Sequence, residues 1–124
     1  MAKIPKSKIM IVDDDARVCQ EVKSHLEGLG YDIVTAPDGP AALALAESAE
    51  FDLVVLDIGM PTMDGLETLG KMLSMDNRLP VILNTAYPSY KDNFMSWAAD
   101  AYVVKSSDLT ELKEKIRESI ARRK

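Results

Sequence analysis

The sequence contains few of the features that build disulfide-rich, membrane or nucleic-acid-binding proteins. Cys19 is the only cysteine, which excludes an internal disulfide framework and a site built from several cysteines. No stretch approaches the roughly 18 apolar residues of a membrane span, so we expect no membrane insertion. The 15 basic residues are outnumbered by 20 acidic ones, a balance that disfavours direct DNA binding. This composition suits a reducing cytoplasm, where we expect the protein to be located.

The length limits the number of domains. A chain of 124 residues that is 47% apolar can bury one sizeable core but has no room for a second catalytic or DNA-binding module. We therefore expect a single domain over residues 1–124, with its core at about residues 8–122. Any output must then pass through a separate partner.

Short apolar runs alternate with longer segments of helical periodicity. The runs are rich in strand-forming residues and span residues 9–12, 31–36, 53–56, 81–83 and 102–104. Apolar residues recur at spacings of three and four in segments 15–29, 39–48, 65–75 and 109–120, which favours amphipathic helices. Nearly continuous apolar strands indicate a parallel sheet buried on both faces. Because crossovers are right-handed, we expect an α/β, doubly wound (βα)5 fold with strand order 2-1-3-4-5.

Polar residues follow the predicted strands at the sheet edge where ligands bind in such folds. They are Asp13, Asp14 and Asp15 after the first strand, Asp57 after the third, Asn84 and Thr85 at the end of the fourth, and Lys105 after the fifth. Any one of them could simply form a turn or cap a helix, and Asp15 suits that role. In the predicted order, strands 1 and 3 are neighbours, so the aspartate cluster should face Asp57.

These residue types together suit phosphoryl transfer. Converging carboxylates repel each other unless a cation lies among them, and oxygen ligands without histidine or cysteine suit Mg²⁺ or Mn²⁺. Lys105 offers a positive charge for phosphate, and Thr85 offers a hydroxyl donor. A carboxylate can itself accept a phosphoryl group as a nucleophile.

Four motifs resemble those of one family across the whole chain. They are IMIVDDD at 9–15, VVLDIGMPTMDG at 54–65, ILNTA at 82–86 and AYVVK at 101–105. The sequence resembles the receiver domain of two-component response regulators, of the single-domain type. The resemblance implies a flavodoxin-like fold and a signalling switch that catalyses only its own phosphorylation and dephosphorylation.

The resemblance also implies roles for individual residues. Asp57 would be the phosphoacceptor, and Asp13 and Asp14 would be the acidic pair. Of these two, Asp14 is favoured as the residue that binds the metal directly. Asp57 and the backbone carbonyl of Gly59 would complete the protein's ligands to Mg²⁺ or Mn²⁺. Thr85 would bond the phosphoryl oxygen.

The remaining roles concern the switch and its partners. Lys105 would pair with the phosphoryl group, and Tyr102 would swing inward behind Thr85. The donor would be the phosphohistidine of a sensor histidine kinase or a histidine phosphotransfer protein. Phosphorylation would shift an inactive–active equilibrium and change a surface that a downstream protein recognises.

The sequence departs from the family pattern in three places. Ser106 stands where the family usually has a proline joined by a cis peptide, so we expect a trans bond with a rearranged loop or a strained cis bond. Pro88 allows the helix of the 87–100 region to begin no earlier than that residue. Gly59 and Tyr87 occupy positions that tune dephosphorylation in this family.

Other functions explain the sequence less completely. A phosphatase of the haloacid dehalogenase type could use Asp13 and Asp15 as its D-x-D pair, but it would leave Asp57 without a role. A flavin-binding module would place the cofactor phosphate against three aspartates. The strongest alternative is a receiver-like protein-interaction domain that does not depend on phosphorylation, because the altered Ser106 loop disables switching.

Overall fold

The computed structural model describes residues 7–57, 65–76, 78–85, 100–105 and 108–123. Within these ranges the chain forms a five-stranded parallel sheet in the order β2-β1-β3-β4-β5. The strands are β1 (Lys8–Val12), β2 (Asp32–Ala36), β3 (Leu53–Leu56), β4 (Val81–Thr85) and β5 (Ala101–Val104). The predicted doubly wound, flavodoxin-like topology is confirmed.

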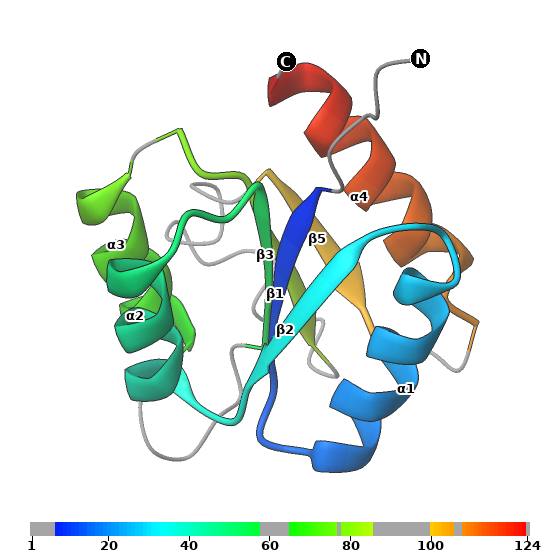
Figure 1. Cartoon of the computed structure of the whole chain (residues 1–124), viewed down its shortest axis with the longest axis horizontal. Coiled ribbons are helices and arrows are strands. Elements are labelled where there is room, and N and C mark those ends of the chain that lie inside the picture. The colour runs from blue at the N-terminus through cyan, green and yellow to red at the C-terminus, as the bar shows by residue number, and fades with distance from the viewer. Residues whose placement is uncertain (1–6, 58–64, 77, 86–99, 106–107, 124) are drawn as a thin grey trace.

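Four described helices cover the two faces of the sheet. They are α1 (Ala16–Glu27), α2 (Gly39–Ser48), α3 (Gly65–Met75) and α4 (Thr110–Arg123). As Figure 1 shows, α2 and α3 lie side by side on one face, and α1 and α4 lie on the other. The helix expected after Pro88 falls outside the described residues. None of the helices in the described ranges has the length and apolar character needed to cross a membrane.

Alternating strand residues divide the core between the two faces. In β1, Met10 and Val12 pack toward α2 and α3, whereas Ile9 and Ile11 pack toward α1 and α4. All four are at most 2% exposed. Successive side chains of a strand point to opposite faces, so a strand covered by helices on both sides must be apolar at every position.

The first helix is shorter than the sequence predicted. It ends at Glu27, and Leu29, the last residue of the segment 15–29 that we predicted as a helix, is 56% exposed. The helix stops because Gly28 and Leu29 turn the chain toward Gly30, whose φ is +97°, a conformation that glycine adopts without steric cost. The predicted boundaries of α2 and α3 are confirmed to the residue.

Candidate functional site

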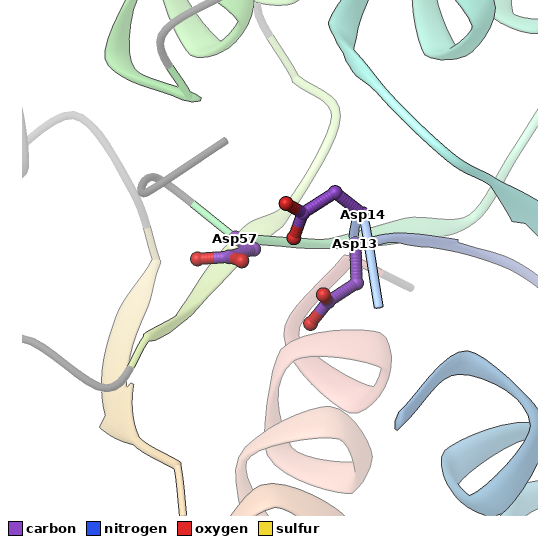
Figure 2. A group of neighbouring side chains, drawn as sticks. All are labelled: Asp13, Asp14 and Asp57. Carbon is purple, nitrogen blue, oxygen red and sulfur yellow. The ribbon is translucent and has the colours of Figure 1, made fainter. Parts of the chain in front are cut away.

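The candidate site begins where two adjacent strands end. The backbone N–H of Asp13 donates to the Ala36 carbonyl at 3.1 Å, and that of Asp57 donates to the Val12 carbonyl at 3.0 Å. These bonds continue the sheet ladder for one residue beyond β1 and β3, so both aspartates are held by backbone geometry. Figure 2 shows Asp13, Asp14 and Asp57 gathered at this edge of the sheet.

The three carboxylates lie close enough to share a cation. One oxygen from each of Asp13, Asp14 and Asp57 lies within 4.8 Å of the other two. Asp13 is 3% exposed and Asp57 is 6% exposed, whereas Asp14 is exposed to solvent. Two buried carboxylates and one accessible carboxylate fit a hard divalent cation that keeps part of its water shell. The donor set therefore suits Mg²⁺ or Mn²⁺.

Lys105 joins the two buried carboxylates. Its Nζ lies 2.6 Å from Asp13 Oδ2 and 3.2 Å from Asp57 Oδ2, and its side chain is 23% exposed. Burial alone would lower the pKa of this ammonium group, but the hydrogen bond and charge of Asp13, followed by those of Asp57, raise the pKa above its ordinary value. Lys105 therefore stays positively charged at neutral pH and balances part of the negative charge of the site.

Asp13 is held through both of its carboxylate oxygens. Its Oδ1 accepts a hydrogen bond from the Asp15 backbone N–H at 2.9 Å, while its Oδ2 faces Lys105. Burial raises the pKa of Asp13 above its ordinary value, and the bonds from Lys105 and Asp15 offset part of that rise. Both carboxylate oxygens thus have donors before any metal arrives.

Asp15 has a structural role instead. Its Oδ1 accepts from the backbone N–H groups of Arg17 and Val18 at 2.9 and 3.4 Å, which caps the amino end of α1. The structure thus gives the third consecutive aspartate the capping role that its position suited.

Of the other predicted site residues, some lie within the described residues and some lie outside them. Thr85 ends β4, where its backbone is in register with Val104 of β5. Tyr102, in register with Leu83, is partly buried and packs against the core on the α2 and α3 face. Gly59 and the Lys105–Ser106 peptide bond lie outside the described residues, so our predictions about them stay untested.

Sequence reasoning missed the position of Cys19. Its thiol donates to the backbone carbonyl of Asp13 with Sγ 3.3 Å from the oxygen, directly behind the acidic cluster. Burial, followed by the charge of Asp13, raises the pKa of this thiol to about 11. The available signal was its place in the first turn of a helix that begins beside the cluster, since that turn faces the strand ends.

Comparison with known proteins decides the family. The family model for the response regulator receiver domain matches residues 9–117. The chain belongs to this family. As a receiver domain it is a signalling switch rather than a catalytic enzyme.

Relatives and solved structures agree with this assignment. The transcriptional regulatory protein PrrA of Mycobacterium tuberculosis is 34% identical over 122 residues, which cover 97% of this receiver domain and 52% of PrrA. ZraR of Salmonella typhimurium is 33% identical over 94% of this chain but only 27% of its own length. The chain thus spans about half, or less, of these transcriptional regulators.

The solved structures match over nearly their full lengths. Response regulator TrrA of Thermotoga maritima, in complex with Mg(2+)-BeF, is 42% identical, with a TM-score of 0.89 over 91% of this receiver domain and 98% of that chain. A CheY-like receiver domain protein of Methanospirillum hungatei is 33% identical, with a TM-score of 0.91 over 96% and 97% of the two chains. TrrA is also solved in complex with histidine kinase ThkA.

Proposed function

We propose that this receiver domain is a phosphoacceptor switch in which Asp57 carries the phosphoryl group. The observation that supports it most directly is the position of Lys105, whose ammonium group contacts both Asp57 and Asp13. A cation held beside a buried carboxylate can pair with the negatively charged oxygens of a phosphoryl group when that group is added to the carboxylate.

The proposed reaction needs no further protein nucleophile. An Asp57 carboxylate oxygen attacks phosphorus, forming an O–P bond as the N–P bond of a phosphohistidine breaks and the imidazole leaves with the bonding electrons. Asp13, Asp14 and Asp57, with the Gly59 carbonyl, would hold Mg²⁺ or Mn²⁺, which supplies charge stabilisation for the transferred group. Water later attacks phosphorus, the bond between the Asp57 oxygen and phosphorus breaks, and inorganic phosphate leaves while the carboxylate is restored.

The response would pass from the site into the sheet. Thr85, at the end of β4, would bond a phosphoryl oxygen, and Tyr102, in register with Leu83 on the neighbouring strand, would move inward behind it. Phosphorylation would thereby shift a conformational equilibrium that already exists. An unidentified downstream protein would recognise the changed surface.

The complex of TrrA with a histidine kinase supports a kinase or histidine phosphotransfer protein as the phosphoryl donor. The charge balance of 15 basic to 20 acidic residues supports a role without direct DNA contact by this chain. We propose a cytoplasmic location, where kinase domains and the Mg²⁺ of the cell are available.

Intact-mass measurement after incubation with acetyl phosphate and Mg²⁺ tests this function. We expect the mass of one phosphoryl group to be added to the wild type and to the control Asp32→Asn, which changes an exposed aspartate of β2. Asp57→Asn should gain none, because the nucleophile is gone, and EDTA should abolish labelling of the wild type.

Two results would reject the proposal. Labelling that persists in Asp57→Asn would place the phosphoacceptor elsewhere. A wild type that gains no mass under conditions that label another receiver domain would favour the phosphorylation-independent interaction domain.

A further inference from the structure

A second acidic feature lies at the opposite end of the sheet from Asp57. A groove of about 640 Å³ opens between the carboxyl ends of α2 and α3 and the turns that lead into β3 and β4. Figure 1 shows these two helices side by side on one face of the sheet. The apolar part of the groove is lined by Ala46, Ala49, Phe51, Met72, Met75 and Leu79.

The lining is apolar at its floor and partly exposed at its rim. Phe51, Met72 and Leu79 are buried, whereas Met75 is 45% exposed, which places a flexible thioether chain where an incoming side chain could pack on it. A groove of this size falls within the range of sites that bury a ligand or an anchoring side chain.

Every charged residue that lines the groove within the described chain is acidic. These residues are Glu47, Glu50 and Asp76, all exposed. No salt bridge of the described residues reaches Glu47 or Glu50. The rim therefore presents a concentrated negative charge around an apolar floor.

The two helices add to this negative field. Because α2 and α3 each follow a parallel strand and return to the same edge of the sheet, their carboxyl ends point the same way. Helix carboxyl ends carry partial negative charge and usually favour basic residues in the last turn, yet neither α2 nor α3 has one there. Both ends therefore favour a cation from outside.

Within the described residues, no basic side chain forms a salt bridge with Glu47 or Glu50. Lys8 Nζ lies 5.3 Å from the centroid of the Phe51 ring but Lys8 is not among the groove residues, and Lys71 pairs with Glu67 at 3.3 Å. Arg78 follows Asp76 closely in the chain, yet its side chain does not line the groove either. The Lys8 contact shows that the Phe51 ring already attracts a cation on one side.

We propose that this groove, defined by α2, α3, Phe51 and Leu79, docks a basic amphipathic helix of a partner protein. Its apolar side chains would pack on Phe51 and Met75, and its Lys or Arg side chains would face Glu47, Glu50 and the two helix ends. This surface lies away from Asp57, so docking does not require phosphorylation.

A synthetic probe tests the proposal on the whole chain. The probe is a peptide of about 14 residues, near the length at which isolated helices become stable, with a leucine stripe on one face and lysines on the other. Its partner peptide replaces every lysine by glutamate. Binding is measured by titration calorimetry, and the bound surface is mapped by amide chemical shifts.

Charge reversal at the rim gives the decisive comparison. Glu47→Lys/Glu50→Lys should weaken binding of the lysine peptide by roughly tenfold or more. Both substitutions place a cation near a helix carboxyl end, so the fold should be kept. The control Glu21→Lys/Glu27→Lys makes the same charge change at exposed positions of α1, on the other face of the sheet, and should change the affinity by less than about twofold.

The expected shifts map to α2, α3 and Leu79, and the glutamate peptide should not bind. Equal weakening by both double variants, shifts centred on another surface, or no saturable binding of the lysine peptide would each overturn the proposal. Retained binding of the lysine peptide by Met75→Ser would also overturn it, because an apolar anchor is then unnecessary. None of these measurements involves phosphorylation, so they stand apart from the labelling of Asp57.

Discussion

Three carboxylates lie at each end of the sheet, but their burial and their pairing with basic residues differ. At the carboxyl end, Asp13 and Asp57 are buried and Lys105 bridges them. At the amino end, Glu47 and Glu50 stand exposed around the groove and no described basic side chain lines it. Burial explains the difference, because a desolvated carboxylate needs a cation within the fold, whereas an exposed one is stabilised by water until a partner arrives.

The two ends of the sheet would also bind an external cation in different ways. The oxygens of Asp13, Asp14 and Asp57 lie close enough to share a small divalent ion, so this cluster would select its cation by coordination. The groove has charges on exposed side chains around an apolar floor, which suits a larger, amphipathic partner. We therefore propose different ligands for two sites of similar negative charge, because the surroundings of the charges differ.

Replacing Lys105, the internal cation, should give the largest loss of stability. Lys105→Met leaves Asp13 and Asp57 buried beside each other without their shared ammonium group. We expect the free energy of unfolding in EDTA to fall by about 3 kcal/mol, the low end for breaking a buried ion pair. Urea denaturation of both proteins measures it.

Adding Mg²⁺ to both proteins gives a second comparison of their stabilities. Mg²⁺ should stabilise Lys105→Met more than the wild type, because the metal replaces the missing positive charge. The control Lys71→Met breaks an exposed pair with Glu67, both side chains being over 50% exposed, and should cost only about 0.3 to 0.5 kcal/mol. A loss in Lys105→Met no larger than in the control would show that the buried cluster needs no internal cation.

The sequence predicted the buried end of the molecule better than the exposed end. Apolar runs and their order were enough to bring Asp13, Asp14, Asp57 and Lys105 together, because parallel topology brings strand ends to one edge. The same reasoning could not place the groove, whose carboxylates come from α2 and from the segments that follow α2 and α3, with no shared motif. Such a surface depends on how the helices pack on the sheet, which periodicity alone does not specify.

Local boundaries show a related limit. The apolar spacing of Val18, Val22 and Leu26 extends to Leu29, so periodicity predicted too long a helix. The chain leaves the helix two residues earlier, at Glu27, on the way to Gly30. The conformation of those turn residues decided the end of the helix, and the hydrophobic pattern carries no information about it.

The thiol behind the acidic cluster gives the next largest expected effect. With a pKa of about 11, Cys19 should hold about 100-fold less thiolate at pH 8 than an ordinary cysteine of pKa near 9. Reaction with a disulfide reagent under native conditions should therefore be slower by at least that factor than in the urea-unfolded chain. A similar rate in both states would contradict the burial and charge that we assign to it.

The same shift sets the direction of the pH dependence of stability. The pKa of Cys19 is higher in the folded chain than its ordinary 9.0. The protonated thiol therefore makes its full contribution to the free energy of unfolding below about pH 9, and this contribution is lost as the pH rises toward 11. In Asp13→Asn the thiol should react faster than in the wild type, because the charge of Asp13 is the second cause of the raised pKa. Asp32→Asn serves as the control, since it removes an exposed carboxylate of β2.

Asp108 shows a third arrangement, in which an exposed carboxylate accepts hydrogen bonds from the neighbouring Thr110. Its Oδ1 accepts from the Thr110 hydroxyl at 2.6 Å and from the Thr110 backbone N–H at 2.9 Å, and these bonds lower its pKa below the ordinary value. Because the folded pKa is depressed, the stabilisation is present above about pH 4 and is lost as the pH falls through the folded pKa. Asp108→Ala should lower the thermal midpoint slightly at pH 7, and the difference from the wild type should vanish in acid. Since the carboxylate is exposed, we expect this to be the smallest of the effects, and a difference that persists in acid would mean that α4 is not stabilised through the charge of Asp108.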